Sequence, residues 1–218
     1  QKKKRMMNLY FMLIDMHVHE MRNSSDSFMS LEEIVEQARQ IGLDGVCITD
    51  HESMGLREYA ELYSKKTGFP VFVGAEYLTR EGDILAFGID RLPDEEQLPA
   101  QEFINYVNER GGVCIAAHPF RNNNRGLGEN LKKVKGLSGI EVLNGSTSDE
   151  ANALAMEYCN ELDLVPFGAS DAHITAKLGK YATRFPKRVK NVSELVEVIK
   201  AGGCLPEITE EYMMVENG

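Results

Sequence analysis

All five histidines of this chain follow short apolar segments, and this placement constrains the fold more than any other feature of the sequence. His17 and His19 end the first apolar run, and His51, His118 and His173 each close a β-rich segment of their own. Residues two apart on a strand point to the same face, so the imidazoles of His17 and His19 should project together. A lone His-x-His pair is weak evidence of a metal site. Five histidines at the same end of the same kind of element predict one shared site.

Helical patterns alternate with these strand-like segments. Ser30 opens the first helix, Glu33 completes a capping box, and Gly42 is the stop signal. Further helices are expected at about 54–67, 100–110, 148–162 and 192–201, between strands at about 44–49, 70–77, 84–89, 113–117, 139–143 and 164–168. This alternation predicts an α/β fold with a parallel sheet, open or closed into a barrel. Ligands bind at the carboxyl ends of the strands in such folds, which is where the histidines stand.

The length and composition suit a single α/β domain. We expect this domain to span residues 8–205, with residues 1–7 and 206–218 as flexible tails. The four cysteines show no C-x-x-C spacing, and Cys47 and Cys114 fall within predicted buried strands. This pattern predicts a reducing compartment, the cytoplasm, with no disulfide framework.

The charge of the chain limits its partners. A formal net charge of −10 argues against a surface that coats duplex nucleic acid or binds anionic membranes. A nucleotide substrate stays compatible with this charge, because bound cations would reverse its sign locally. The basic residues 1–5 resemble the start of a signal peptide, but no cleavage site follows and the apolar run leads directly to His17. No apolar run approaches the roughly 20 residues that a membrane span needs.

The candidate ligands are too many for one zinc ion, which takes about four. Acids close two more strand-like segments, at Glu76 and Glu141, and carboxylates can bridge ions, so these residues predict a centre of two or three metals. The motifs occur in this order: His-x-His at 17–19, Thr-Asp-His at 49–51, Gly-x-Glu at 74–76, Ala-His-Pro at 117–119 and Ser-Asp-x-His at 170–173. Over about residues 12–185, the chain thus resembles the small single-domain branch of the PHP (polymerase and histidinol phosphatase) family of metal-dependent phosphoesterases.

The resemblance implies a fold and a set of metal ligands. The fold would be a distorted (β/α)7 barrel with a trinuclear centre. Asp26 matches an acid that follows His-x-His in the small-phosphoesterase branch, and Asp83 stands where many relatives carry a histidine. Both are candidate ligands, and an aspartate at 83 favours manganese or iron over zinc. Glu76 and Asp171 would be the bridging carboxylates. The other implied ligands are His17, His19, His51, His118 and His173.

The reaction that the resemblance implies is hydrolysis of a phosphate ester. A hydroxide held between two divalent ions of manganese, iron or zinc would attack phosphorus in line. Arg121 would neutralise charge on the phosphoryl oxygens, and His173 or His51 would protonate the leaving group, which makes Arg121 and His173 the candidate catalytic residues. The loops at 79–83, 91–99 and 121–128 are short, which favours a small phosphomonoester or nucleotide over a polymer.

Two other functions stay open from the sequence alone. One is a metal-dependent hydrolase of another bond, similar to the amidohydrolases, which usually use a carboxylated lysine and a longer chain. The other is a metal-binding domain without catalysis. Single residues also carry alternatives: Glu141 lines the site or pairs with a lysine, Arg121 binds phosphate or is solvated, and Asp50 orients an imidazole rather than binding metal. The roles of Asn144 and Lys177, the substrate and the oligomeric state stay open.

Overall fold

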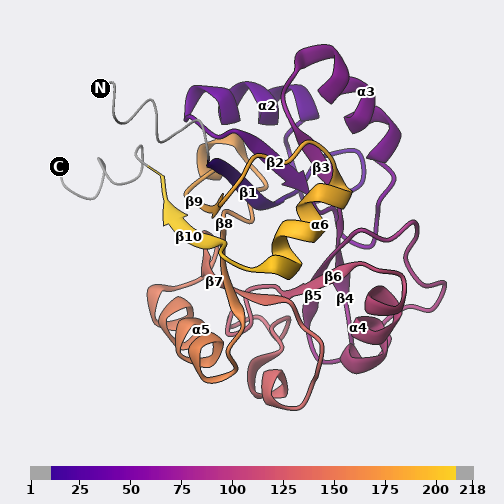
Figure 1. The fold of residues 1–218 in the computed structure, drawn as a ribbon, viewed down its shortest axis with the longest axis vertical. Helices are drawn as coiled ribbons and strands as arrows, with labels where there is room; N and C mark the ends of the chain where they lie inside the picture. Colours follow the sequence, from indigo (N-terminus) through magenta and orange to yellow (C-terminus); the bar gives the residue numbers. More distant parts are fainter. Residues whose placement is uncertain (1–10, 210–218) are drawn as a thin grey trace.

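The computed structural model describes residues 11–209, whose ten strands form two five-stranded sheets (Figure 1). The first sheet contains β1 (Met12–Val18), β2 (Gly45–Ile48), β3 (Val71–Val73), β9 (Tyr181–Phe185) and β10 (Leu205–Ile208). The second contains β4 (Ala75–Leu78), β5 (Asp83–Phe87), β6 (Val113–Ala116), β7 (Gly139–Asn144) and β8 (Val165–Ala169). The strand order is β10-β9-β1-β2-β3 in the first sheet and β4-β5-β6-β7-β8 in the second.

Both sheets mix parallel and antiparallel pairs. β1, β2 and β3 run parallel, as do β6, β7 and β8, in agreement with the predicted α/β class. β5 pairs antiparallel with β4 and β6, and β9 with β1 and β10. Residues 79–82 between β4 and β5 are too few for a helical crossover, so the chain returns antiparallel. The closed (β/α)7 barrel is therefore not confirmed, because the strands within residues 11–209 divide into two sheets.

Five α-helices and two short 3-10 helices complete the described residues. They are α2 (Leu31–Gln40), α3 (Arg57–Thr67), α4 (Ala100–Glu109), η1 (Gly128–Lys132), α5 (Asp149–Glu161), η2 (Thr175–Lys177) and α6 (Val192–Ala201). The predicted capping box is confirmed: the Ser30 side chain accepts from the Glu33 N–H, and the Glu33 carboxylate accepts from the Ser30 N–H. The other four predicted helices are also confirmed, with α3 beginning at Arg57 rather than near 54. No helix in this part of the chain is long and apolar enough to cross a bilayer.

Four helices pack on the outer faces of the sheets, and a fifth packs between the sheets. α2 and α3 pack on the outer face of the first sheet, and α4 and α5 pack on the outer face of the second (Figure 1). α6 lies between the sheets, where Leu195 and Ile199 pack with Met16 of β1, Phe87 of β5 and Phe167 of β8. Apolar side chains from both sheets and α6 thus fill the interior, and the polar residues gather at the strand ends.

The patterns of the sequence do not predict β9 and β10. β10 begins at the end of the expected domain and continues to Ile208, through residues expected to be a tail. Pro206 weakens a strand pattern, because it lacks an N–H for the ladder. The strand pairs with β9 along its whole length, and Arg184 Nε lies 2.6 Å from Glu207 Oε1 across the pair. Residues 1–7, the start of the first apolar run at 9–10, and residues 210–218 lie outside the described residues.

The two sheets meet where their strands end. One isolated bridge joins Val18 to Ala172, and a second joins His51 to Glu76. A single residue, Gly74, separates β3 from β4, so the chain passes from the first sheet to the second within one residue. This crossing places Glu76 at the junction of the sheets.

We expect Gly74→Ala to destabilise the protein and disturb the strand that carries Glu76. A Cβ at position 74 would lie 2.5 Å from the Ala86 carbonyl oxygen and 2.6 Å from the Phe87 ring. The free energy of unfolding, measured in urea, should fall by about 3 kcal/mol, the upper range for overpacked cores. Gly68→Ala is the matched control: its Cβ enters open space, and only its φ of 70° costs about 1 kcal/mol. Equal losses in the two variants would contradict the close contact.

Candidate metal centre

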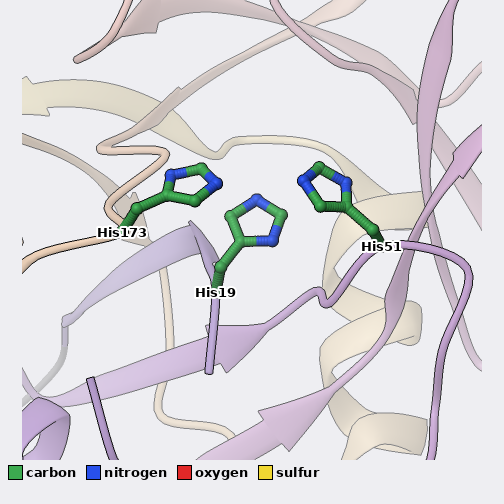
Figure 2. A group of neighbouring side chains, drawn as sticks. All are labelled: His19, His51 and His173. Carbon is green, nitrogen blue, oxygen red and sulfur yellow. The ribbon is translucent and has the colours of Figure 1, made fainter. Parts of the chain in front are cut away.

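The structure brings all five histidines together at the junction of the two sheets. Figure 2 shows His19, His51 and His173, which come from separate segments of the chain and turn their rings toward one another. The ring centroid of His19 lies 4.3 Å from that of His51 and 4.2 Å from that of His173. His17 lies beside them, with its ring centroid 4.9 Å from His19 and 5.7 Å from His118.

Among the described residues, four groups of three side chains place their ligand atoms within 4.8 Å of one another. The groups are His19, His51 and His173; His17, His19 and Glu76; His17, His118 and Asp171; and Glu76, Asp83 and His118. Together they contain every sequence-predicted ligand except Asp26. The groups share members, so they form one continuous cluster.

Glu76 occupies the middle of this cluster. Its Oε1 lies 2.9 Å from His118 Nε2, and its Oε2 lies 2.8 Å from His51 Nδ1. Oε2 is also 3.5 Å from Nε2 of both His17 and His19. One buried carboxylate thus reaches four imidazoles, as a bridging ligand would need to do.

Four atoms of the inner cluster have the spacing of ligands around one cation. The Nε2 atoms of His17 and His19 are 3.0 Å apart. Their distances to Glu76 Oε2 are 3.5 Å each, and those to Asp171 Oδ1 are 3.5 Å and 3.3 Å. Tetrahedral ligands about 2.1 Å from a zinc-sized ion are about 3.4 Å from one another. The inner donors therefore fit a divalent cation.

The hydrogen bonds of the two inner histidines lead to the same conclusion. His17 Nδ1 lies 2.8 Å from Glu141 Oε1, and a carboxylate can only accept, so Nδ1 carries the proton. His19 Nδ1 lies 3.2 Å from Ser24 Oγ, whose hydroxyl donates to Asp50, so this Nδ1 donates as well. The Nε2 lone pairs then face each other at 3.0 Å, which requires a cation that both atoms bind from one side or a second proton on one ring.

Three more buried atoms of the cluster lack a hydrogen-bond partner among the described residues. They are Glu76 Oε2, His51 Nδ1 and His118 Nδ1. Glu76 Oε2 and His51 Nδ1 are 2.8 Å apart but not in hydrogen-bonding geometry, which is the relation expected of two ligands on one ion. Buried polar atoms are costly to leave without partners, so their concentration here also fits a metal centre.

The electrostatics of the cluster differ from residue to residue. Burial lowers the pKa of His19 to about 4, although Asp171 opposes this shift. Burial also opposes ionisation of Glu76, but the positive field of His17 outweighs it and holds the pKa of Glu76 well below its usual range. Burial, together with the charge of Glu76, raises the pKa of Asp83 to about 6, and Arg125 opposes this shift. His19 thus offers a lone pair and Glu76 a negative charge, which are the forms that bind metal.

Glu141 binds two histidines of the cluster through hydrogen bonds and pairs with no lysine among the described residues. Besides His17 Nδ1, its carboxylate accepts from the His118 backbone N–H at 2.8 Å and from Asn144 Nδ2 at 2.9 Å. It therefore fixes the ring of His17 and the position of His118. Asn144 is buried in the same network, whereas Lys177 is exposed on η2.

Asp50 reaches an imidazole through an intermediate residue that the sequence does not single out. Its carboxylate accepts from the Glu20 N–H at 2.6 Å and from Ser24 Oγ at 3.1 Å. Ser24 in turn lies against His19 Nδ1 and accepts from the His51 N–H. Ser24 lies in the polar loop Ser24-Ser25-Asp26-Ser27, and nothing else in the sequence points to this role.

Asp26 lies at the mouth of the centre. Its Oδ2 is 3.2 Å from Nε2 of His51 and 3.2 Å from Nε2 of His173. The Asp26 side chain is 54% exposed, against 27% and 26% for the two histidines. These three residues form an outer group that solvent can reach.

The two arginines of the 121–128 loop both point into the centre. Arg121 Nη2 donates to Asp171 Oδ2 and, at 3.2 Å, to Asn144 Oδ1, so Arg121 is not a solvated surface group. Arg125 donates to both oxygens of Asp83. Nothing in the sequence of this short loop predicts the ion pair between Arg125 and Asp83.

β1 is tied to the segment after β8 by buried hydrogen bonds. The Asp15 carboxylate accepts from the N–H of Ser170 at 2.9 Å and of Gly179 at 3.0 Å, and burial raises its pKa to about 6. The Asp171 N–H donates to the His17 carbonyl at 2.8 Å. Asp171 has a φ of 52°, a left-handed conformation that is strained for aspartate and common at functional sites.

Two solved structures share this mixed α/β fold. PsfC from Pseudomonas syringae matches with a TM-score of 0.71 and 19% identity, over 95% of this chain and 97% of that chain. A two-domain protein from Bacteroides vulgatus, which contains a predicted PHP-like metal-dependent phosphoesterase, matches with a TM-score of 0.72 and 19% identity, over 94% of this chain and 68% of that chain. At these identities the similarity shows the fold alone.

Sequence comparison gives the family. A family model described as PHP-associated matches residues 149–204. An uncharacterized protein of Methanocaldococcus jannaschii is 30% identical over 148 residues, which cover 63% of this chain and 85% of that relative. The chain belongs to the PHP family.

Proposed function

We propose that this chain is a metal-dependent phosphoesterase that hydrolyses a small phosphorylated substrate, such as a phosphomonoester or a nucleotide. The observation that carries the proposal is the single cluster of histidines and acids with Arg121 directed into it. Imidazoles and buried acids at these distances suit divalent cations, and a guanidinium beside them suits a phosphoryl group. The phosphoesterase predicted within the Bacteroides vulgatus protein, which shares the fold, supports the same reaction.

The cluster offers distinct places for its ions. His17, His19, Glu76 and Asp171 would hold an inner ion, and Asp26, His51 and His173 an outer one. Glu76, Asp83 and His118 form a third corner, so the centre would hold two or three ions of manganese, iron or zinc. When bound, such ions lower the pKa of a coordinated water and offset charge on phosphoryl oxygens.

The residues around the cluster would position the substrate. Arg121 is 19% exposed, and its guanidinium can donate to phosphoryl oxygens from beside Asp171. His173 stands at the mouth, where its Nε2 can carry a proton to the leaving-group oxygen when no metal holds it. Glu141 would hold His17 and His118 in place while the proton is transferred to the leaving group.

We also propose that the two sheets are the halves of the distorted (β/α)7 barrel that the family resemblance implies. The isolated bridges at Val18–Ala172 and His51–Glu76 join the sheets at both junctions. β3 and β4 follow each other through Gly74, so that one segment passes from the first sheet into the second, as a strand shared by the two halves of an opened barrel would.

The structure disfavours the alternative in which a carboxylated lysine holds the metals. The buried charged residues of the described chain are aspartates, glutamates and histidines, and none of them is a lysine. A hydrolase of another bond would therefore need a different bridging group, and Glu76 already reaches four imidazoles.

A substrate panel tests the proposal. Protein loaded with Mn²⁺ should release inorganic phosphate from one or more phosphomonoesters or nucleotides, and Asp171→Asn should lower this release by at least about 10²-fold. Glu157→Gln, on the exposed face of α5, is the control and should keep the wild-type rate. Hydrolysis of amides or lactones without phosphate release would favour the amidohydrolase-like alternative. Metal binding without turnover of any substrate would favour the non-catalytic domain.

A further inference from the structure

The corner formed by Glu76, Asp83 and His118 differs from the rest of the cluster. Its ligand atoms lie within 4.8 Å of one another, so by spacing alone it would accept a metal ion. Asp83 Oδ2 is 3.8 Å from His118 Nε2, and Asp83 is completely buried. What separates this corner from the others is that a guanidinium engages both oxygens of its aspartate, whereas Arg121 contacts only Oδ2 of Asp171 and leaves Oδ1 to the inner group.

That guanidinium belongs to Arg125. Its Nε donates to Asp83 Oδ2 at 2.7 Å, and its Nη2 donates to Asp83 Oδ1 at 2.9 Å. The two bonds form the parallel, bidentate arrangement in which a planar guanidinium matches a carboxylate best. Both oxygens of Asp83 are therefore engaged, and a metal ion at this corner would have to share the carboxylate with a fixed positive charge a hydrogen-bond length away.

The backbone holds Arg125 in this position. The Asp83 N–H donates to the Arg125 carbonyl at 2.7 Å, and the Arg125 N–H donates to Asn123 Oδ1 at 3.0 Å. Gly82 packs so closely on the 125–127 backbone that a Cβ there would lie 2.5 Å from Gly126 and Leu127 atoms. Backbone contacts as well as the Arg125 side chain thus join the start of β5 to the 121–128 loop.

The remaining donors do not depend on Asp83. The inner group of His17, His19, Glu76 and Asp171 has the spacing of one cation site, and Asp26 reaches both His51 and His173 at 3.2 Å. Without Asp83, the inner and the outer group would each keep all of their ligands.

We propose that the Arg125 guanidinium takes the place of a third metal ion, so that the centre holds two divalent cations and one fixed organic cation. The inference rests on the proposed metal-dependent function and specifies its stoichiometry. Arg125 neutralises Asp83 permanently, whereas the two exchangeable ions occupy the inner and outer groups.

Metal counting tests this inference without measuring activity. Full-length protein saturated with Mn²⁺ should contain two equivalents by elemental analysis, and its crystals should show two anomalous peaks, at the inner and outer groups. Asp83→Asn should keep two equivalents, because Asp83 is not a ligand. Arg125→Ala should free the corner and raise the count from two to three. Arg91 is exposed, so Arg91→Ala is the control and should leave the count at two.

Each result has a distinct meaning. Three equivalents in the wild-type protein, or the loss of one equivalent in Asp83→Asn, would overturn the role of Arg125 while leaving the metal-dependent function intact. No bound metal in the wild-type protein would overturn the proposed function itself. The wild-type count decides the matter even where Arg125→Ala does not fold.

Discussion

Glu76→Gln should lower the rate of phosphoester hydrolysis by at least about 10²-fold and should reduce the metal content of the purified protein. The carboxylate reaches His118 through one oxygen and His51, His17 and His19 through the other. Glutamine keeps the size and one acceptor oxygen but removes the negative charge, and it brings an NH2 group toward atoms that would bind cations. Loss of one preorganised electrostatic group typically costs 10²–10³-fold in kcat, or about 3–4 kcal/mol of barrier.

Steady-state phosphate release and elemental analysis would be measured on the same preparation. Glu157→Gln makes the same chemical change on an exposed helix face and should alter neither quantity. If Glu76→Gln kept the wild-type turnover and metal content, Glu76 would not bridge the ions, and the centre would have to lie elsewhere.

Removal of metal by a chelator should lower the melting temperature by roughly 10 °C. Ions that bind the native state alone stabilise it by about 4 kcal/mol at a thousandfold excess over Kd, and each kcal/mol shifts the Tm of a chain of this size by about 2–4 °C. Scanning fluorimetry on loaded, stripped and reloaded protein measures the shift. Reloading should restore the Tm, and Glu76→Gln should show a smaller shift than wild type. A Tm that does not respond to the chelator would show that ions do not hold the acids.

The stripped protein should also lose stability as the pH rises. Burial opposes the charged form of His17, but Asp171, Glu141 and Glu76 outweigh it and raise the pKa of His17 well above 6.5. A raised pKa contributes stability that is complete below pH 6.5, the unfolded value, and is lost as the pH rises through the folded value. The gap in Tm between loaded and stripped protein should therefore widen above pH 6.5.

Much of the centre can be predicted from the sequence because it depends on a local rule. Each histidine follows an apolar, strand-like segment, and the carboxyl ends of parallel strands in such folds share one edge. His17, His51, His118 and His173 come together for this reason, without any knowledge of the loops. The helix that begins after Ser30 is equally local, because its capping box lies within four residues.

The parts that the sequence does not reveal depend on contacts between distant residues. Arg125 and Asp83 are 42 residues apart, and nothing in either motif distinguishes an arginine that pairs with the acid from one that faces solvent. Ser24 likewise joins Asp50 to His19 only once the loops after β1 and β2 are both in place. β9 and β10 are short and lie at one edge of the sheet, so pairing rather than hydrophobic pattern defines them.

The bonds from Asp15 to Ser170 and Gly179 span 155 and 164 residues of chain. A chain emerging from the ribosome presents its first two histidines long before the segment that closes around them. Contacts of such long sequence separation form late and slowly, because the intervening loop must lose its entropy first. The full ligand set, which includes Asp171, therefore forms only after this closure, and a nascent chain halted before Ser170 would offer His17 and His19 to imidazole-binding metals without that carboxylate.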